Sequence, residues 1–152
     1  MNKQSPSARL SGFLAKYSPE IRVVARAALS KMRATIPGSL ELVYDNYNAL
    51  AIGFSPTERA SNAVVSIAVY PRWISLFFLQ ATDLPDPTLL LKGSGKKVRH
   101  VVLVSANEID RPEIQSLIAA AVSRAFIPFN PKARNRLLIK SVSAKQRPRR
   151  PV

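Results

Sequence analysis

The sequence predicts an α+β fold, a two-layer sandwich in which helices pack on one face of an antiparallel sheet of about five strands. Three observations lead to this prediction. Apolar residues recur at helical spacing through the first 36 residues, β-branched and aromatic residues cluster in short runs between residues 40 and 104, and a second helical pattern begins near residue 112. No internal repeat interrupts this order, so we expect one globular unit.

Two helices are expected in the first 36 residues. Residues 7–17 place apolar side chains at helical spacing, with basic residues off that face. A second helix begins after Ser18, because serine caps helices and Pro19 suits the first turn. It continues to about residue 36, where a proline–glycine pair ends it.

Four expected strands lie in the centre of the chain, at residues 40–47, 48–54, 63–70 and 73–80. The last two are the strongest, since they are rich in β-branched and aromatic residues, and Pro71-Arg72 joins them as a hairpin. Both faces of these two strands are largely apolar. One face should meet the helices and the other needs a cover, for which we favour the protein's own helices and loops over a ligand pocket.

The next stretch combines a turn with a fifth strand. Asp86 predicts a cap for a short helical turn over residues 88–92, and Gly93 would end that turn in the left-handed conformation. The fifth strand is expected at residues 97–104. The final helix follows and ends where prolines begin at Pro128.

The charge is unevenly distributed along the chain. Of 152 residues, 23 are basic and 9 are acidic, which gives a net charge of +14. Eight of the basic residues and none of the acidic ones follow residue 127. We therefore expect an α+β domain at residues 1–127 and a basic, partly disordered tail at residues 128–152.

Composition excludes several kinds of site. The chain has no cysteine, so disulfides and thiolate chemistry are excluded and a reducing cytoplasm is favoured. A single histidine and few acids disfavour a metal site, and we expect no cofactor. No apolar run approaches the ~20 residues of a membrane span, and no secretory signal is visible.

Glycines and cations around residue 95 predict a ligand site. A phosphate-binding P-loop is excluded, because Lys97 stands where the hydroxyl residue should be and a strand follows instead of a helix. A weaker anion-binding nest is retained as a hypothesis, weighed against a plain turn. We predict that a small polar or anionic ligand contacts Tyr44, Tyr47, Lys92, Gly93, Gly95, Lys96, Arg99 and His100.

His100 is the only candidate for acid–base chemistry. In a strand it shares its side with Val98, Val102 and Val104, which predicts the more apolar side and a half-buried, hydrogen-bonded ring. No nucleophile elbow or partner acid accompanies it. We therefore predict a non-enzymatic, ligand-binding domain.

The alternative prediction is a nucleic-acid-associated protein that acts through its tail. The candidate contacts are Lys140, Lys145, Arg147, Arg149 and Arg150. Against this, no aromatic residue interleaves the tail arginines and no nucleic-acid-binding motif is present. The uncovered sheet face also admits a homodimer.

Several segments resemble the YdhG-like domains of unknown function. They are YDNYNALAIGFSPTERAS from Tyr44, AVYPRWISLFFLQ from Ala68, LKGSGKKVRH from Leu91 and IKSVSAKQRPRR from Ile139. The resemblance implies a small α+β fold with an antiparallel sheet and flanking helices. Distant relatives of that family resemble frataxin-type iron chaperones, which present an acidic ridge. The nine acids here are scattered, so the resemblance does not extend to an iron role.

Overall fold

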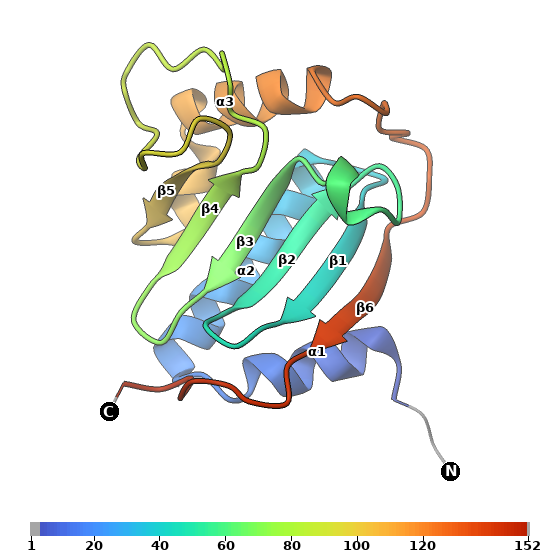
Figure 1. Ribbon diagram of the computed structural model, residues 1–152, viewed down its shortest axis with the longest axis vertical. Coiled ribbons are helices and arrows are strands. Elements are labelled where there is room, and N and C mark those ends of the chain that lie inside the picture. The colour runs from blue at the N-terminus through green and yellow to red at the C-terminus, as the bar shows by residue number, and fades with distance from the viewer. Residues whose placement is uncertain (1–3, 152) are drawn as a thin grey trace.

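The computed structural model describes residues 4–151 and confirms the predicted α+β sandwich (Figure 1). The helices are α1 (Pro6–Leu14), α2 (Pro19–Thr35) and α3 (Pro112–Ser123), with short 3-10 turns η1 (Ala60–Asn62) and η2 (Ala106–Asp110). The strands are β1 (Leu40–Asp45), β2 (Leu50–Ser55), β3 (Val65–Val69), β4 (Ile74–Phe78), β5 (Arg99–Leu103) and β6 (Arg136–Val142). Figure 1 shows α2 behind the strands, with α3 along their upper end and α1 along their lower end, so that the other face of the sheet is toward the viewer.

The helices begin where local chemistry favours it. The hydroxyl of Ser5 accepts a hydrogen bond from the N–H of Ala8 and caps α1. Each of the three helices has proline in its first turn, where the missing N–H costs nothing. Helix α2 buries a stripe at Ala25, Ala28 and Met32 against the sheet, at the 3–4 residue spacing that defines one helix face.

The sheet is antiparallel except at one edge. Its strand order is β5-β4-β3-β2-β1-β6, and consecutive strands from β1 to β5 pair as neighbours. Ile52, Ile67 and Leu76 oppose one another across β2, β3 and β4. All three are fully buried and belong to the core between the sheet and the helices.

The sixth strand comes from the segment that we expected to be a partly disordered tail. β6 pairs parallel with β1, with Leu137 opposite Glu41 and Ile139 opposite Val43. Leu137 and Ile139 pack against the core, and the side chain of Asn135 accepts a hydrogen bond from the N–H of Gly38 at 2.7 Å. The sheet therefore extends beyond the expected domain boundary at residue 127. Burial of the apolar side chains of β6 offsets the entropy lost when this segment is ordered.

The chain beyond β6 is anchored through the carboxylate of Asp45. Asp45 is fully buried and accepts from Nζ of Lys16 at 3.0 Å and from a terminal guanidinium nitrogen of Arg149 at 2.9 Å. Arg149 is 5% exposed, although it lies three residues from the C-terminus. Gln146 adds a hydrogen bond to the main-chain oxygen of Asp45 at 3.1 Å. One carboxylate thus joins the end of α1, the end of β1 and residues 146–149.

Tyr17 seals the same end of the sheet. Its hydroxyl donates to the oxygen of Val69 at 2.7 Å and accepts from the N–H of Leu50 at 3.2 Å. Burial raises the pKa of Tyr17 to about 12, so the hydroxyl keeps its proton at neutral pH.

Two local predictions were wrong. No helical turn forms at residues 88–92; instead the carboxylate of Asp86 accepts the N–H groups of Leu90 and Leu91 at 2.9 Å each. His100 is half-buried, as predicted, but it lies on the outer side of β5, where Val102 and Val104 are exposed, while Val101 and Leu103 face the core. Its ring packs on Phe77 and makes no hydrogen bond within the described residues, contrary to the prediction. Strand alternation separates two faces, but it does not say which of them the helices cover.

The free edge of β5 is largely blocked. The backbone of Lys92 exchanges two hydrogen bonds with His100, at 2.7 and 3.0 Å, and the N–H of Val104 donates to the carboxylate of Glu108. Blocking of this kind keeps an edge strand from pairing with another chain. The edge therefore offers little support for a dimer built by strand pairing.

Replacing Arg149 with methionine should lower the free energy of unfolding by about 3 kcal/mol, because it leaves the buried carboxylate of Asp45 with one cation fewer. Urea unfolding measures the change. The control is Arg150→Met, since Arg150 is exposed and its Nε donates only to the oxygen of Lys16. We expect the control to change stability by about 0.5 kcal/mol or less. Equal effects of the two substitutions would contradict the anchoring role of Arg149.

Stability should also depend on pH through Asp45. Burial alone would raise the pKa of its carboxyl, but contacts with Gln146, Lys16 and Arg149 outweigh burial and hold the pKa below its ordinary value. The carboxylate therefore contributes stability above the unfolded-state pKa of about 3.9, and this contribution is lost as the pH falls through the lower folded-state pKa. Asp45→Asn should cost about 3–5 kcal/mol at neutral pH, since it leaves Arg149 buried without a countercharge. Unfolding curves recorded down the acid range should converge for the two proteins; a constant gap would refute the linkage.

Candidate functional site

The face of the sheet away from the helices is only partly covered. Its residues are small on the middle strands β2 and β3, where Ala51 pairs with Ala68 and Gly53 pairs with Ser66. The segment that contains η1 crosses one end, and a Cβ placed on Gly53 would lie 3.5 Å from the Cβ of Ala63. The expected cover is thus supplied by the protein's own loop at that end only. We call the rest of this surface the open face.

Two adjoining pockets lie on the open face. The first, the sheet-face pocket, has a volume of about 550 Å³ and is lined by Asn46, Tyr47, Asn48, Ala49, Ala51, Ser66, Ala68, Tyr70, Phe77, Leu79 and Ser143. The second, the tail pocket, has a volume of about 570 Å³ and is lined by Asn48, Tyr70, Pro71, Arg72, Trp73, Arg147, Pro148, Arg150 and Pro151. They share Asn48 and Tyr70, so together they form one open groove.

Two hairpin turns and the tail build this groove. The β1–β2 turn is closed by a hydrogen bond from the N–H of Asn46 to the oxygen of Ala49, and the β3–β4 turn by one from Tyr70 to Trp73. Both turns lie at the same end of the sheet, because β2 and β3 pair there through Leu50 and Val69. Residues 143–151 run beneath both turns in Figure 1.

Aromatic rings are exposed in the groove. The tight β3–β4 turn stacks Tyr70 on Trp73, with ring centroids 4.6 Å apart and planes at 18°. Trp73 is 43% exposed and Tyr47 is 48% exposed. The guanidinium of Arg147 lies 5.7 Å from the centre of the Tyr47 ring, within the range of a cation–π contact.

The electrostatic field of the groove is positive. Arg72, Arg147 and Arg150 line the tail pocket, and no acidic residue of the described chain lines either pocket. Asp45 is the nearest acid along the chain, but its carboxylate is buried and paired with Lys16 and Arg149. An anion entering the groove would therefore meet three guanidinium groups without a competing carboxylate.

The predicted glycine turn has the wrong polarity for an anion nest. Gly93 has the expected left-handed backbone, with φ of +112°. The side chain of Arg99, however, donates from Nε to the oxygen of Gly95 at 2.5 Å and from a terminal nitrogen to the oxygen of Gly93 at 2.6 Å. A nest requires converging N–H groups, whereas this turn directs carbonyl oxygens at a cation.

The predicted ligand residues do not meet at one place. Tyr44 and Tyr47 belong to β1 and its turn, whereas the residues from Lys92 to His100 lie at the β5 edge, and strands β2, β3 and β4 separate the two groups. Tyr47 lines the groove. Tyr44 lies beside it, and its buried hydroxyl has no hydrogen-bond partner among the described residues, so burial raises its pKa. The ring of His100 packs 5.2 Å from that of Phe77, at the margin of the sheet-face pocket.

The predicted tail cations have different environments. Arg149 is buried against Asp45 and is not accessible to a partner. The ammonium of Lys140 donates to the oxygen of Glu58 at 3.0 Å. Lys145 is exposed, and Arg147 and Arg150 line the tail pocket.

Sequence reasoning missed the residues of the β3–β4 turn as site residues. Tyr70, Arg72 and Trp73 were read only as strand and hairpin residues, and so was Phe77 of β4. The available signal was two aromatic residues flanking a proline–arginine turn, which places both rings on one side of a hairpin tip. The proximity of Tyr70, Arg72 and Trp73 to Arg147 and Arg150 had no signal in the sequence, because 74 or more residues separate them along the chain.

Metal-ion and membrane-spanning features are absent from the described part of the chain. Within residues 4–151, no group of three or more histidine, aspartate or glutamate side chains is placed to hold a metal ion. In the same range, no helix combines the length and apolar character needed to cross a bilayer.

Comparison of the chain with protein-family models, curated proteins and solved structures finds no match. The resemblance to YdhG-like domains therefore stays a prediction.

The role of Arg99 can be tested through hydrogen exchange. Arg99→Met should speed amide exchange in residues 92–98, because two carbonyl oxygens lose their donor, while global stability changes by about 1 kcal/mol or less. Lys96→Met is the control, since Lys96 is exposed in the same turn and its side chain makes no hydrogen bond within the described chain. Unchanged exchange in the Arg99 variant would show that the turn holds its shape without the guanidinium.

Proposed function

We propose that the protein is a binding protein, and that its ligand is an anion with a planar or aromatic part held in the groove on the open face. The observation that carries the proposal is the composition of the two adjoining pockets, in which aromatic rings and arginines line the wall and acids do not. The proposal keeps the predicted anionic ligand and moves its site from the glycine turn to the hairpin end of the sheet.

Geometry supports this location. Pockets of 300–1,000 Å³ with apolar walls and a few placed polar groups are typical of ligand sites, and each half of the groove has such a volume. Arginine suits the tail pocket because its planar guanidinium pairs with phosphate or carboxylate in a bidentate way. Residues 143–151 act here as a wall of the site. Their two exposed arginines, Arg147 and Arg150, make no ion pair within the described residues and replace the unstructured basic arm that the alternative prediction assumed.

The test is a thermal-shift measurement with defined anions, namely pyrophosphate, citrate, heparin and mononucleotides. At about 100 times its Kd, a ligand should raise the melting temperature of the wild type by about 5–10 °C. The double variant Arg72→Gln/Arg147→Gln should lose most of this shift. Its matched control is Arg26→Gln/Lys132→Gln, which removes the same charge from exposed cations outside the groove that make no ion pair within the described chain. Equal losses in both variants, or no shift with any anion, would reject the proposal.

A further inference from the structure

Exposed aromatic rings sit beside the cations of the groove. Trp73 follows Arg72 directly, and the ring of Tyr47 lies under the guanidinium of Arg147. A simple anion would use the arginines and leave these rings without a role. A ligand with planar rings uses both, because bases stack on aromatic side chains and on guanidinium planes alike.

Two amide side chains lie in the groove beside Tyr47. Asn46 and Asn48 flank Tyr47 in the β1–β2 turn and line the sheet-face pocket. Both are exposed, and neither side chain makes a hydrogen bond with another described residue. A free amide offers two donors and one acceptor oxygen, which matches the mixed donors and acceptors on the edge of an unpaired base.

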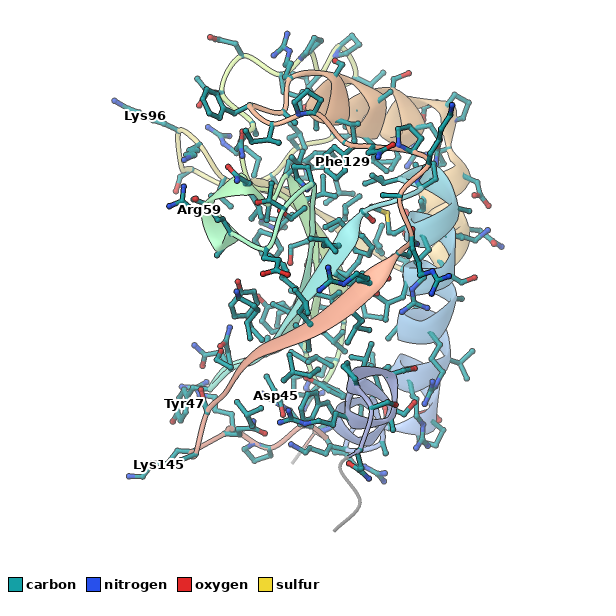
Figure 2. All side chains as sticks on the ribbon, turned by 90° about the vertical axis from the view of Figure 1, so that its right-hand side faces the viewer. Asp45, Tyr47, Arg59, Lys96, Phe129 and Lys145 are labelled. Atoms are coloured by element: carbon teal, nitrogen blue, oxygen red, sulfur yellow. The ribbon has the colours of Figure 1, made fainter. Side chains whose placement is uncertain are left out.

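Cations flank the open face at both ends of the strands. Figure 2 shows the sheet from its edge, with the helices on the right and the open face on the left. Lys96 and Arg59 project to the left from the loops at one end, and Tyr47 and Lys145 do so at the other. A five-residue strand spans about 17 Å, so a small anion cannot reach both ends. An extended polyanion that crosses the face can.

From these features we infer that the groove binds single-stranded nucleic acid, with bases stacked on Tyr47 and Trp73 and phosphates on the arginines of the tail pocket. The inference rests on the proposed function and names the ligand class of that same groove. Lys96 and Arg59 are the phosphate contacts at the far end of the strands. The glycine turn that carries Lys96 thus contributes charge without forming a binding nest.

The same features disfavour a duplex and a free nucleotide. A duplex keeps its bases stacked on one another, so the exposed rings would find no base to contact. A free nucleotide could occupy the tail pocket, but it would leave the cations at the far end of the strands unused. The open groove is suited to a ligand that enters from the side and continues past it.

The experiment measures fluorescence anisotropy with the full chain and labelled oligonucleotides of about 12 nucleotides, a length within the range of single-strand sites. DNA and RNA of one mixed sequence are compared with the matching duplex, with heparin and with mononucleotide as competitors. Salt is varied from about 50 to 300 mM, because phosphate contacts make affinity fall with salt. We expect single strands to bind more tightly than the duplex and to be displaced poorly by mononucleotide.

Two variant pairs separate the contributions of charge and stacking. Arg72→Gln/Arg147→Gln should weaken oligonucleotide binding about tenfold or more and reduce the salt slope by about 2, while Arg26→Gln/Lys132→Gln should not change the slope. Trp73→Leu and Tyr47→Leu should each weaken oligonucleotide binding about fivefold or more and weaken heparin binding clearly less. Tyr47 lies on the other hairpin from Trp73, so it tests stacking even where Trp73→Leu disturbs the β3–β4 turn.

The outcomes decide between ligands. Equal affinity for the duplex, tight binding of mononucleotide alone, or wild-type oligonucleotide affinity in both aromatic variants would overturn the inference. Binding of heparin or pyrophosphate that depends on Arg72 and Arg147 would, in those cases, still support the proposed anion site. If none of the tested anions binds in the groove, both the proposed anion site and the single-strand inference are rejected.

Discussion

The buried carboxylate of Asp45 is the interaction on which the arrangement of this protein depends. It binds Lys16 from α1 and Arg149 from the C-terminal segment, so three parts of the chain meet at one charge. A carboxylate so deeply buried requires paired cations, since an unpaired charge there would cost several kcal/mol. This pairing also positions the neighbouring residues. Because Arg149 is anchored to Asp45 beside the hairpin turns, Arg147 and Arg150 line the groove.

The open face follows from the number of helices and where they pack. Three helices cover one side of a six-stranded sheet, whereas the loop that contains η1 crosses the other side at one end. Small residues at Ala51, Ser66 and Ala68 keep the apolar area exposed there low, which makes an uncovered sheet tolerable in water. The most exposed rings of the groove, those of Tyr47 and Trp73, stand at the hairpin tips. The surface is therefore a shallow floor with aromatic and cationic rims, suited to holding an elongated ligand.

The helices and the first five strands were predictable because each depends on local pattern. Serine caps, prolines in first turns and apolar spacing define helices within a few residues, and the runs around β3 and β4 favour strands by composition. Gly93 has the predicted left-handed backbone, although the helical turn that it was expected to end does not form. β6 was not predictable, because its apolar content is modest and its partner β1 lies over 90 residues away. The burial that stabilises this strand comes from the packing of Leu137 and Ile139 against a core built by other segments.

By itself, the sequence determined the α+β class, most element positions, the excess of positive charge and the exclusion of thiolate chemistry, since these depend on composition and short-range spacing. The tertiary structure alone decided which side of β5 carries His100, whether the tail is a free arm or a wall, and where aromatic rings meet arginines. Those outcomes depend on contacts between segments far apart in the chain. The free energy of these contacts comes from burial and charge pairing, which require the packed sheet and helices.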